Sequence, residues 1–334
     1  VKEIQKDLDD GIDTIGKKMT VCQLYAKQIR HRGNVRYNTK NGRKRLMKLL
    51  EEDKLGGCPI DSVKLSDAKE WAIRMKEKGI SYKTISNDKR SLKAAFYTAI
   101  QDDCIRKNPF DFQLNTVIED DTEPKVPLTP AQEESFLSFA QNDKVYQKYY
   151  DELIILLGTG LRISELCGLT DTDINFENRI INVDHQLLRS AETGYYIETP
   201  KTKSGIRQIP MSEKVYEAFN RVLKRRRGAK AVTIDGYSNF LFLNRDGYPK
   251  TATNYDGMFR GLAKKYNKCH EEALPKVMPP HTLRHTFCTN MANAGMNPKA
   301  LQYIMGHSNI TMTLNYYAHA TFDSAKAEML RIAA

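Results

Sequence analysis

Cysteine and tryptophan are scarce in this sequence, and long apolar runs are missing from it. The six cysteines are scattered along the 334 residues without a Cys-x-x-Cys pair. That distribution argues against a disulfide framework or a zinc site and predicts reduced thiols in an intracellular protein. The apolar run at 153–157 is too short to span a bilayer, and no signal peptide is visible. Because the sequence has no clustered Asp/Glu motif of the kind that holds catalytic metal ions, we expect neither a metal nor a cofactor.

Positive charge is what the chain has in excess. Its 52 Lys and Arg residues outnumber its 41 Asp and Glu residues, which gives a formal net charge of +11. A basic balance of this size is expected of a protein with a polyanionic partner, although a cationic enzyme without such a partner would show it too. The length is that of about two domains, each long enough to bury a core.

The first part of the chain has helical periodicity with basic edges. Ser66 and Ser81 are the predicted N-caps of a third and a fourth helix, and Trp71 lies on the predicted buried face of the third. Lysines four residues apart share one side of a helix, and such like charges repel unless an anion lies against them. We therefore expect phosphate contact, rather than only a solvated face, for Lys40, Arg43, Lys44, Lys48, Lys83, Lys89, Arg90 and Lys93.

The second part of the chain is expected to be mostly helical with a small antiparallel sheet. A polar stretch with two prolines at 119–127 predicts an interdomain linker, and Thr129 starts a capping box after it. A very apolar helix is predicted over 149–158. Alternation at 174–188 predicts a strand, and 195–210 predicts a β-hairpin.

Two segments of this second part hold residues suited to phosphate chemistry. Arg162 lies in an apolar segment, so it needs an anionic partner, either a carboxylate such as Glu165 or a phosphate. The second segment, 280–319, contains a His-x-x-Arg pair, a Gly-His-Ser triplet and two adjacent tyrosines, which are His281, Arg284, His307, Tyr316 and Tyr317. Two arginines and two histidines can hold a phosphodiester, and a tyrosine can attack it.

In their order and approximate spacing these residues resemble the motif set of the tyrosine recombinases, the phage-type integrases, and the sequence around them is similar to integrases of conjugative transposons. The resemblance implies a mainly α fold, with a helical core-binding domain and a mostly α catalytic domain that contains a small antiparallel β-sheet. It implies that residues 1–17 are a connector from an absent N-terminal arm-binding domain and that residues 18–118 are a core-binding domain. A linker at 119–127, a catalytic domain at 128–320 and a tail at 321–334 that docks on a neighbouring protomer would follow.

The function implied by the resemblance is site-specific recombination of DNA for integration and excision of a mobile element. The enzyme would cut and rejoin strands through a 3′-phosphotyrosyl intermediate and a Holliday junction. Expected partners are double-stranded DNA, further copies of the chain in a tetramer, an excisionase and a host DNA-bending protein, in the cytoplasm of a bacterium and on its nucleoid when bound. Phage integration, chromosome-dimer resolution and a catalytically silent DNA-binding factor are the alternatives.

The resemblance also implies roles for single residues in the phosphate site. Arg162 and Arg284 would hold the scissile phosphate. His307 would donate a hydrogen bond to it, and His281 would assist proton transfer with the nucleophile. Glu165 would support the site, with Asp173 as a weaker candidate for that role.

The general acid and the nucleophile are each chosen from two candidates. Lys203, which fits the pattern better than Lys201, would give a proton to the departing 5′-oxygen. Adjacent tyrosines on a helix point about 100° apart, so only one can face the phosphate. The Tyr-x-His ending favours Tyr317 over Tyr316 as the nucleophile, and His285 is expected to be structural, with a supporting role in the site as the alternative.

Overall fold

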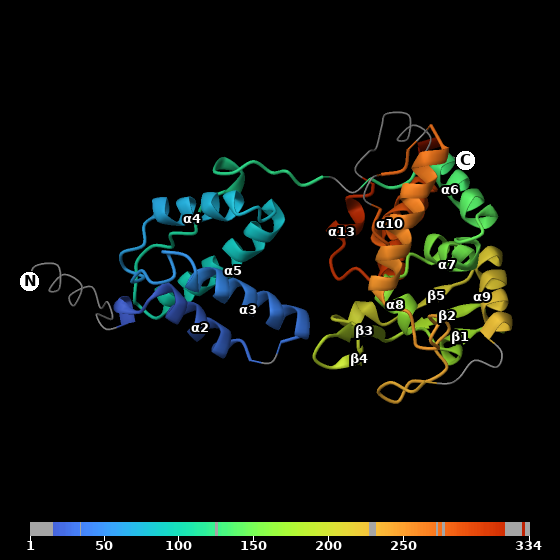
Figure 1. Cartoon of the computed structure of the whole chain (residues 1–334), viewed down its shortest axis with the longest axis horizontal. Helices are drawn as coiled ribbons and strands as arrows, with labels where there is room; N and C mark the ends of the chain where they lie inside the picture. The colour runs from blue at the N-terminus through green and yellow to red at the C-terminus, as the bar shows by residue number, and fades with distance from the viewer. Residues whose placement is uncertain are drawn as a thin grey trace, which may run out of the picture. The chain divides into compact units, whose positions relative to one another are not determined.

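The computed structural model of the chain describes residues 16–33, 35–123, 126–226, 232–271, 273–275, 278–317 and 329–330. The chain divides into two compact units, Val1–Pro124 and Lys125–Ala334, whose elements are labelled in Figure 1. The predicted connector at 1–17 and the predicted tail at 321–334 lie almost wholly outside the described residues. His319, the histidine of the Tyr-x-His ending, also lies outside them.

The described part of the first unit is helical, as the periodicity predicts. Its elements are η1 (Gly16–Lys18), α2 (Val21–His31), α3 (Tyr37–Glu51), α4 (Leu65–Glu77), α5 (Tyr82–Gln101) and η2 (Leu114–Thr116). Trp71 on α4 is fully buried, and its ring lies edge-on to Phe110 with the centroids 5.8 Å apart. The predicted cap of α4 is wrong, because the helix begins two residues earlier than predicted and Lys64, not Ser66, is its N-cap.

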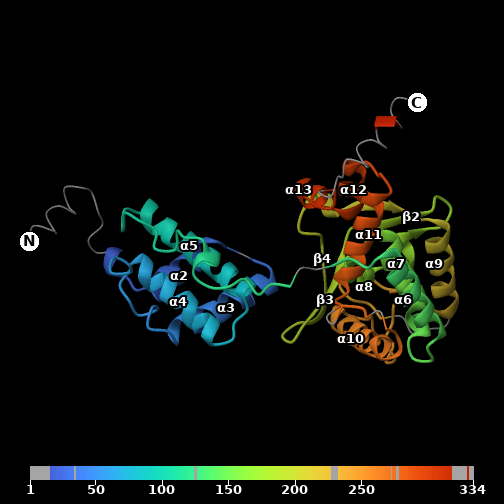
Figure 2. The same cartoon turned by 90° about the horizontal axis from the view of Figure 1, so that it is seen from above.

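Helices also make up most of the second unit. They are α6 (Pro130–Asn142), η3 (Gln147–Tyr149), α7 (Tyr150–Thr159), α8 (Ile163–Gly168), η4 (Asp171–Asp173), η5 (Lys203–Gly205), α9 (Glu213–Arg226), α10 (Ala252–Cys269), α11 (His281–Asn293), α12 (Pro298–Met305) and α13 (Thr311–Leu314). The apolar helix α7 packs against α6, α9 and α11, and Figure 2 shows α11 beside α7. Its buried Leu153, Ile155 and Leu156 belong to the core of this unit. This packing fixes the position of Arg162, which follows α7.

The strands form two small antiparallel sheets instead of the predicted single strand and hairpin. One sheet has the order β1-β2-β5, and the other pairs β3 with β4. Their bounds are β1 (Ile174–Asn175), β2 (Ile180–Val183), β3 (Gln186–Ser190), β4 (Gly194–Glu198) and β5 (Arg207–Pro210). The predicted hairpin at 195–210 is wrong because Gly194, at φ +70°, closes a tight turn between β3 and β4. β5 pairs with β2 instead, with Ile209 opposite Ile181.

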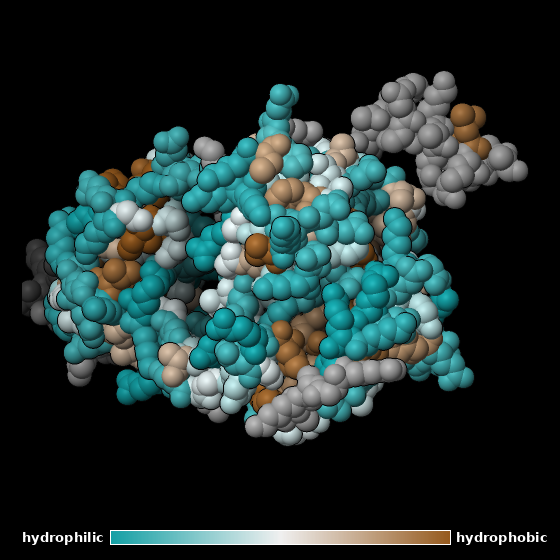
Figure 3. Space-filling view, turned by 45° about the vertical axis from the view of Figure 1, so that its right-hand side comes forward, coloured by the Kyte–Doolittle hydropathy of each residue, from teal (hydrophilic) through white to brown (hydrophobic). Residues whose placement is uncertain are grey.

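Hydrophilic residues cover most of the surface that Figure 3 shows, with smaller hydrophobic areas between them. Among the residues described above, no helix combines the length and the apolar character that a membrane crossing requires.

Candidate functional site

The turn between α7 and α8 presents Arg162. Gly160 ends α7 in the left-handed region at φ +63°, and a Cβ there would lie 2.5 Å from a ring carbon of Phe287. Only glycine fits this close approach to α11. Arg162 then caps α8: its backbone N–H donates to Glu165 Oε2 at 2.8 Å and its Nη1 donates to Oε1 at 2.7 Å. The Arg162 side chain remains 32% exposed, whereas those of Arg207 and Arg284 are buried.

Glu165 is shared with a second arginine, Arg207, which the sequence prediction missed. The Arg207 side chain is fully buried on β5, and its Nη1 and Nη2 donate to Glu165 Oε1 and Oε2 at 3.0 and 2.9 Å. Burial alone would raise the pKa of Glu165. The hydrogen bonds and charge of Arg207, with the charges of Arg162 and Arg284, lower that pKa to about 2. Glu165 is therefore a carboxylate at any working pH.

Arg284 on α11 completes a cluster of positive charge. Its side chain is buried, and its guanidinium donates to the carbonyls of Gly160 at 2.5 Å and of Met305. Burial, and then the charge of Arg162, lower the pKa of Arg284 to about 9, so it is still charged at pH 7. Since Arg162, Arg207 and Arg284 face a single carboxylate, the cluster keeps an excess of positive charge. It is therefore suited to an anion.

His307 is brought to the same cluster by the end of α12. Gly306 ends this helix at φ +60°, and its carbonyl accepts a hydrogen bond from Arg162 Nη2 at 3.1 Å. His307 is buried, with Nδ1 2.9 Å from Oγ1 of Thr313 on α13. Burial and the neighbouring arginines lower the pKa of His307 to about 4. The imidazole is therefore neutral near pH 7.

The two tyrosines lie differently with respect to this cluster. The Tyr316 hydroxyl contacts Nδ1 of His285, whose ring centroid is 5.4 Å from that of His281. Burial and Cys288 raise the pKa of Tyr316 to about 12, although the charge of Arg284 acts in the opposite direction. The Tyr317 hydroxyl instead donates to the carbonyl of Met296 at 2.5 Å. The geometry thus places Tyr316, the alternative candidate, nearer than Tyr317 to the arginine cluster.

Lys203 and Asp173 are the two remaining sequence candidates in this unit. Lys203 is exposed in η5, a connection between the two sheets and not the turn of a hairpin. Its neighbour Gly205 is held by Arg207, whose Nη1 donates to the Gly205 carbonyl at 3.0 Å. Asp173 accepts hydrogen bonds from the backbone and the hydroxyl of Thr170 and so caps η4.

The predicted DNA-contacting cations fall into two groups. On α3, Lys40, Lys44 and Lys48 are exposed, and with Arg43 they border a hollow whose lining also includes apolar side chains. On α5, Lys83 and Arg90 are exposed, whereas Lys89 and Lys93 are half-buried. These two lysines hold the segment after the helix, through the Phe112 carbonyl and the Asp111 carboxylate, each at 2.5 Å. The α3 face is therefore the more accessible of the two.

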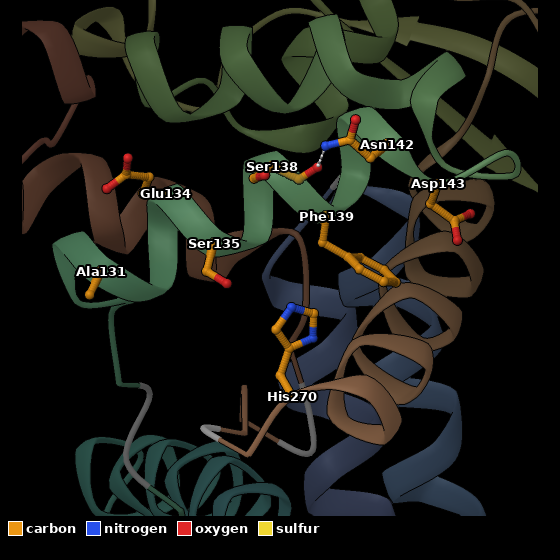
Figure 4. Close-up of a pocket in the computed structure, with 8 residues that line it drawn as sticks. All are labelled: Ala131, Glu134, Ser135, Ser138, Phe139, Asn142, Asp143 and His270. Atoms are coloured by element: carbon orange, nitrogen blue, oxygen red, sulfur yellow. Dashed lines mark hydrogen bonds between the residues drawn. The ribbon is translucent and has the colours of Figure 1, made fainter.

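Two other places in the second unit have some of the character of ligand sites. A hollow of about 510 Å³ lies between α6 and His270, whose ring faces Phe139 in Figure 4. Within the described ranges, donor atoms close enough together for a metal ion occur in Asp173, Asp184 and His185. There the polar groups already make hydrogen bonds within the protein, since the two ring nitrogens of His185 lie 2.5 Å from the Asp184 carboxylate and 2.8 Å from the Gly168 carbonyl. Neither place shares a residue with the arginine cluster.

Comparison with known proteins identifies close relatives. The family model described as the phage integrase family matches residues 127–324. Over 332 residues the chain is 68% identical to the transposase from transposon Tn916 of Enterococcus faecalis, covering 99% of this chain and 82% of that protein. The transposase from transposon Tn1545 of Streptococcus pneumoniae gives the same identity and coverage.

Solved structures of a transposon integrase are also similar to this chain. The Tn1549 transposon integrase in complex with a circular intermediate DNA is 78% identical, with a TM-score of 0.90 over 94% of this chain and 99% of that one. The same integrase in complex with transposon right end DNA gives 78% identity and a TM-score of 0.89, over 95% of this chain and 100% of that one. The first carries an arginine-to-lysine substitution and the second a tyrosine-to-phenylalanine substitution. These two positions are separated by as many residues as Arg162 and Tyr316 are here.

Proposed function

Because the chain belongs to the phage integrase family, as an integrase of the kind found in conjugative transposons, we propose that its arginine cluster holds the scissile phosphate of duplex DNA and that a tyrosine beside the cluster attacks it. The enzyme cuts and rejoins DNA strands in the integration and excision of a mobile element. Arginine and histidine side chains supply the positive charge and the hydrogen bonds for this chemistry.

The observation that carries this proposal is the convergence of Arg162, Arg284 and His307 on the Gly306 end of α12. Arg162, the most exposed arginine of the cluster, binds a phosphate oxygen directly. Arg284 acts on the phosphate through its charge and not through a direct hydrogen bond, because its Nη1 and Nη2 already donate to backbone carbonyls. Charge fixed in place before the reaction stabilises the negative charge that develops on the phosphorane.

His307 acts as a neutral hydrogen-bond donor in this proposal. A neutral imidazole carries a proton on one nitrogen, and the other nitrogen accepts. If the Thr313 hydroxyl donates to Nδ1 of His307, the proton lies on Nε2. Nε2 then donates to a phosphate oxygen without adding a titratable charge near pH 7.

Tyr316 is our candidate for the nucleophile, in place of the sequence-based choice of Tyr317. The contact of its hydroxyl with His285 and the equal arginine-to-tyrosine separation in the Tn1549 integrase support this choice. Because burial raises the pKa of Tyr316 to about 12, a base must take its proton during attack. His285, which contacts the hydroxyl, and His281 beside it are the imidazoles available for that transfer.

With Tyr316 as the nucleophile, the bonds that form and break in the cleavage step follow directly. The Tyr316 oxygen forms a bond to phosphorus, the bond to the 5′-oxygen breaks, and that oxygen takes a proton. Lys203 is proposed as its source, with Lys201 in the same exposed connection as the alternative. A 3′-phosphotyrosyl bond conserves the energy of the phosphodiester, so rejoining requires no ATP.

DNA binding involves both units in this proposal. The Tn1549 integrase structures are complexes with transposon DNA. By analogy we assign residues 18–118 to a core-binding domain with α3 toward the phosphates, 119–127 to a linker and 128–320 to the catalytic domain. Four copies would act together through a Holliday junction, with an excisionase and a host DNA-bending protein, on the bacterial nucleoid.

The test is covalent trapping on DNA. A nicked duplex carrying the right end of Tn1549 is incubated with the protein in EDTA, and the products are separated under denaturing conditions. We expect a protein–DNA band that protease removes and that Arg162→Lys reduces. DNA binding without any covalent band would instead support the catalytically silent DNA-binding factor.

A further inference from the structure

Arg207 is a buried cation that has no part in the roles proposed above. It lies on β5 two residues before Ile209, and its side chain is 0% exposed. A guanidinium removed from water must place its N–H groups on protein acceptors. In Arg207 they reach both oxygens of Glu165, the Ile304 carbonyl at 2.6 Å and the Gly205 carbonyl at 3.0 Å.

These acceptors belong to segments that each carry a proposed site residue. Glu165 supports Arg162 through a 2.7 Å hydrogen bond. The Gly205 carbonyl ends the η5 turn that begins at Lys203. Ile304 is in the last turn of α12, which His307 follows after Gly306. A single side chain therefore joins the general-acid turn, the first arginine and the histidine segment.

Glu165 is the contact through which Arg207 most directly affects the chemistry. Arg207 binds this carboxylate with two parallel N–H groups, whereas one N–H of the Arg162 side chain does so. If Arg207 were absent, the buried carboxylate would depend on Arg162 for its remaining bonds. Arg162 would then turn toward Glu165, and the excess positive charge of the cluster would fall.

We propose that Arg207 is a positioning residue for strand cleavage: by binding both oxygens of Glu165, it leaves Arg162, the most exposed arginine of the cluster, for the phosphate and holds the Lys203 turn against α12. This inference rests on the proposed function, because it assumes that the cluster binds the scissile phosphate. Arg207 itself does not touch DNA.

Three variants and one matched control test the proposal. Arg207→Met removes the charge and the paired N–H groups, Arg207→Lys keeps only the charge, and Arg207→Met with Glu165→Gln removes both partners. The control is Arg221→Met, because Arg221 is one of two arginines on another buried carboxylate of the same unit, Asp151, at 2.8 Å. The readouts are the Kd for the Tn1549 right-end duplex and the single-turnover rate of covalent complex formation at saturating protein.

We expect Arg207→Met to slow covalent complex formation by about 10²-fold, while Kd changes by less than about three-fold, because a misplaced group costs rate more than binding. Adding Glu165→Gln is expected to recover about ten-fold of that rate, because the unpaired carboxylate is gone. Arg221→Met is expected to cleave within about three-fold of wild type. A merely structural role would instead reduce rate, binding and melting temperature in Arg207→Met and Arg221→Met alike.

The proposal is overturned if folded Arg207→Met cleaves at the wild-type rate, or if Glu165→Gln gives no recovery. Should Arg207→Met fail to fold, Arg207→Lys decides the question, since its charge without the paired N–H groups is expected to slow cleavage by about ten-fold. A wild-type protein that binds the duplex but forms no covalent complex refutes the proposed function and this role together. A cleaving wild type beside an unimpaired Arg207 variant refutes only this role.

Discussion

Replacing Gly306 with alanine is expected to reduce strand cleavage by more than the accompanying loss of stability explains. Gly306 has φ +60°, where an L-residue costs about 1–2 kcal/mol. A Cβ at this position would lie 3.0 Å from the Ser204 carbonyl oxygen and 3.2 Å from Cδ and Nη1 of Arg207. Those atoms would have to move by a few tenths of an ångström. Because the Gly306 carbonyl also binds Arg162, the strain falls on the groups that we propose bind the phosphate.

A matched control separates the backbone cost from the effect on the site. Gly295 follows α11 at φ +78°, and a Cβ there would have no atom within 4 Å. Gly295→Ala therefore carries the same backbone cost of about 1–2 kcal/mol without displacing Arg207 or the Ser204 turn. Gly306→Ala should lose at least as much free energy of unfolding in urea as Gly295→Ala, and it alone should lose about ten-fold in cleavage rate.

The assay is single-turnover formation of the covalent complex on the Tn1549 right-end duplex, with urea unfolding of the same preparations. If Gly306→Ala loses stability but cleaves within about three-fold of wild type, the close packing around Gly306 does not set the rate. If Gly295→Ala loses cleavage equally, the rate follows global stability and the argument from local geometry is refuted.

Two further predictions concern proton binding and salt. Because burial and the arginines lower the pKa of His307 from 6.5 to about 4, the unfolded chain binds a proton in this window that the folded chain does not. Between pH 7 and pH 5 the wild type should therefore lose about 2 kcal/mol of unfolding free energy that His307→Gln does not lose. Urea unfolding of both proteins at both pH values measures these losses, and equal losses in the two proteins would contradict the prediction. On α3, Lys44→Ala should lower the slope of log Kd against log salt by about 1. The control is Lys54→Ala, because Lys54 is exposed but outside the predicted phosphate-contact set, and it should leave the slope unchanged. Fluorescence anisotropy across a KCl series measures both slopes, and an unchanged slope for Lys44→Ala would remove Lys44 from the phosphate contacts.

Helical periodicity was sufficient to predict the core of the first unit. On α4, Ala68, Trp71, Ala72 and Met75 recur at the spacing of one helical face, and all four are buried. The helix start was less accurate, because Ser66 has the chemistry of a cap but the first turn already includes it.

The pairing of the strands could not be predicted from the local pattern. The stretch 195–210 contains strand residues on both sides of a glycine-containing turn, which is the pattern of a hairpin. The actual partners are set by contacts outside this stretch, because β4 pairs back with β3 and β5 pairs with β2. Arg207 nevertheless had a detectable signal, since it alternates with Ile209 at an inward position of the strand.

One part of the candidate site could be predicted from the sequence, and another part could not. The motif spacing predicts that Arg162 and Glu165 lie on one side of α8, and the structure joins them by hydrogen bonds. Which of two adjacent tyrosines faces the cluster depends on packing after α13. There Tyr317 reaches the Met296 carbonyl and Tyr316 reaches His285, and the Tyr-x-His motif does not contain that information.

The most direct test of the account is to identify the tyrosine that becomes linked to DNA. The covalent complex on the nicked Tn1549 right-end duplex is digested with nuclease and protease, and mass spectrometry locates the modified residue. Tyr316→Phe and Tyr317→Phe proteins are assayed in parallel. We expect attachment at Tyr316, with no covalent complex from Tyr316→Phe and normal yield from Tyr317→Phe. Attachment at Tyr317 would contradict the proposed arrangement of the nucleophile beside His285 and the arginine cluster.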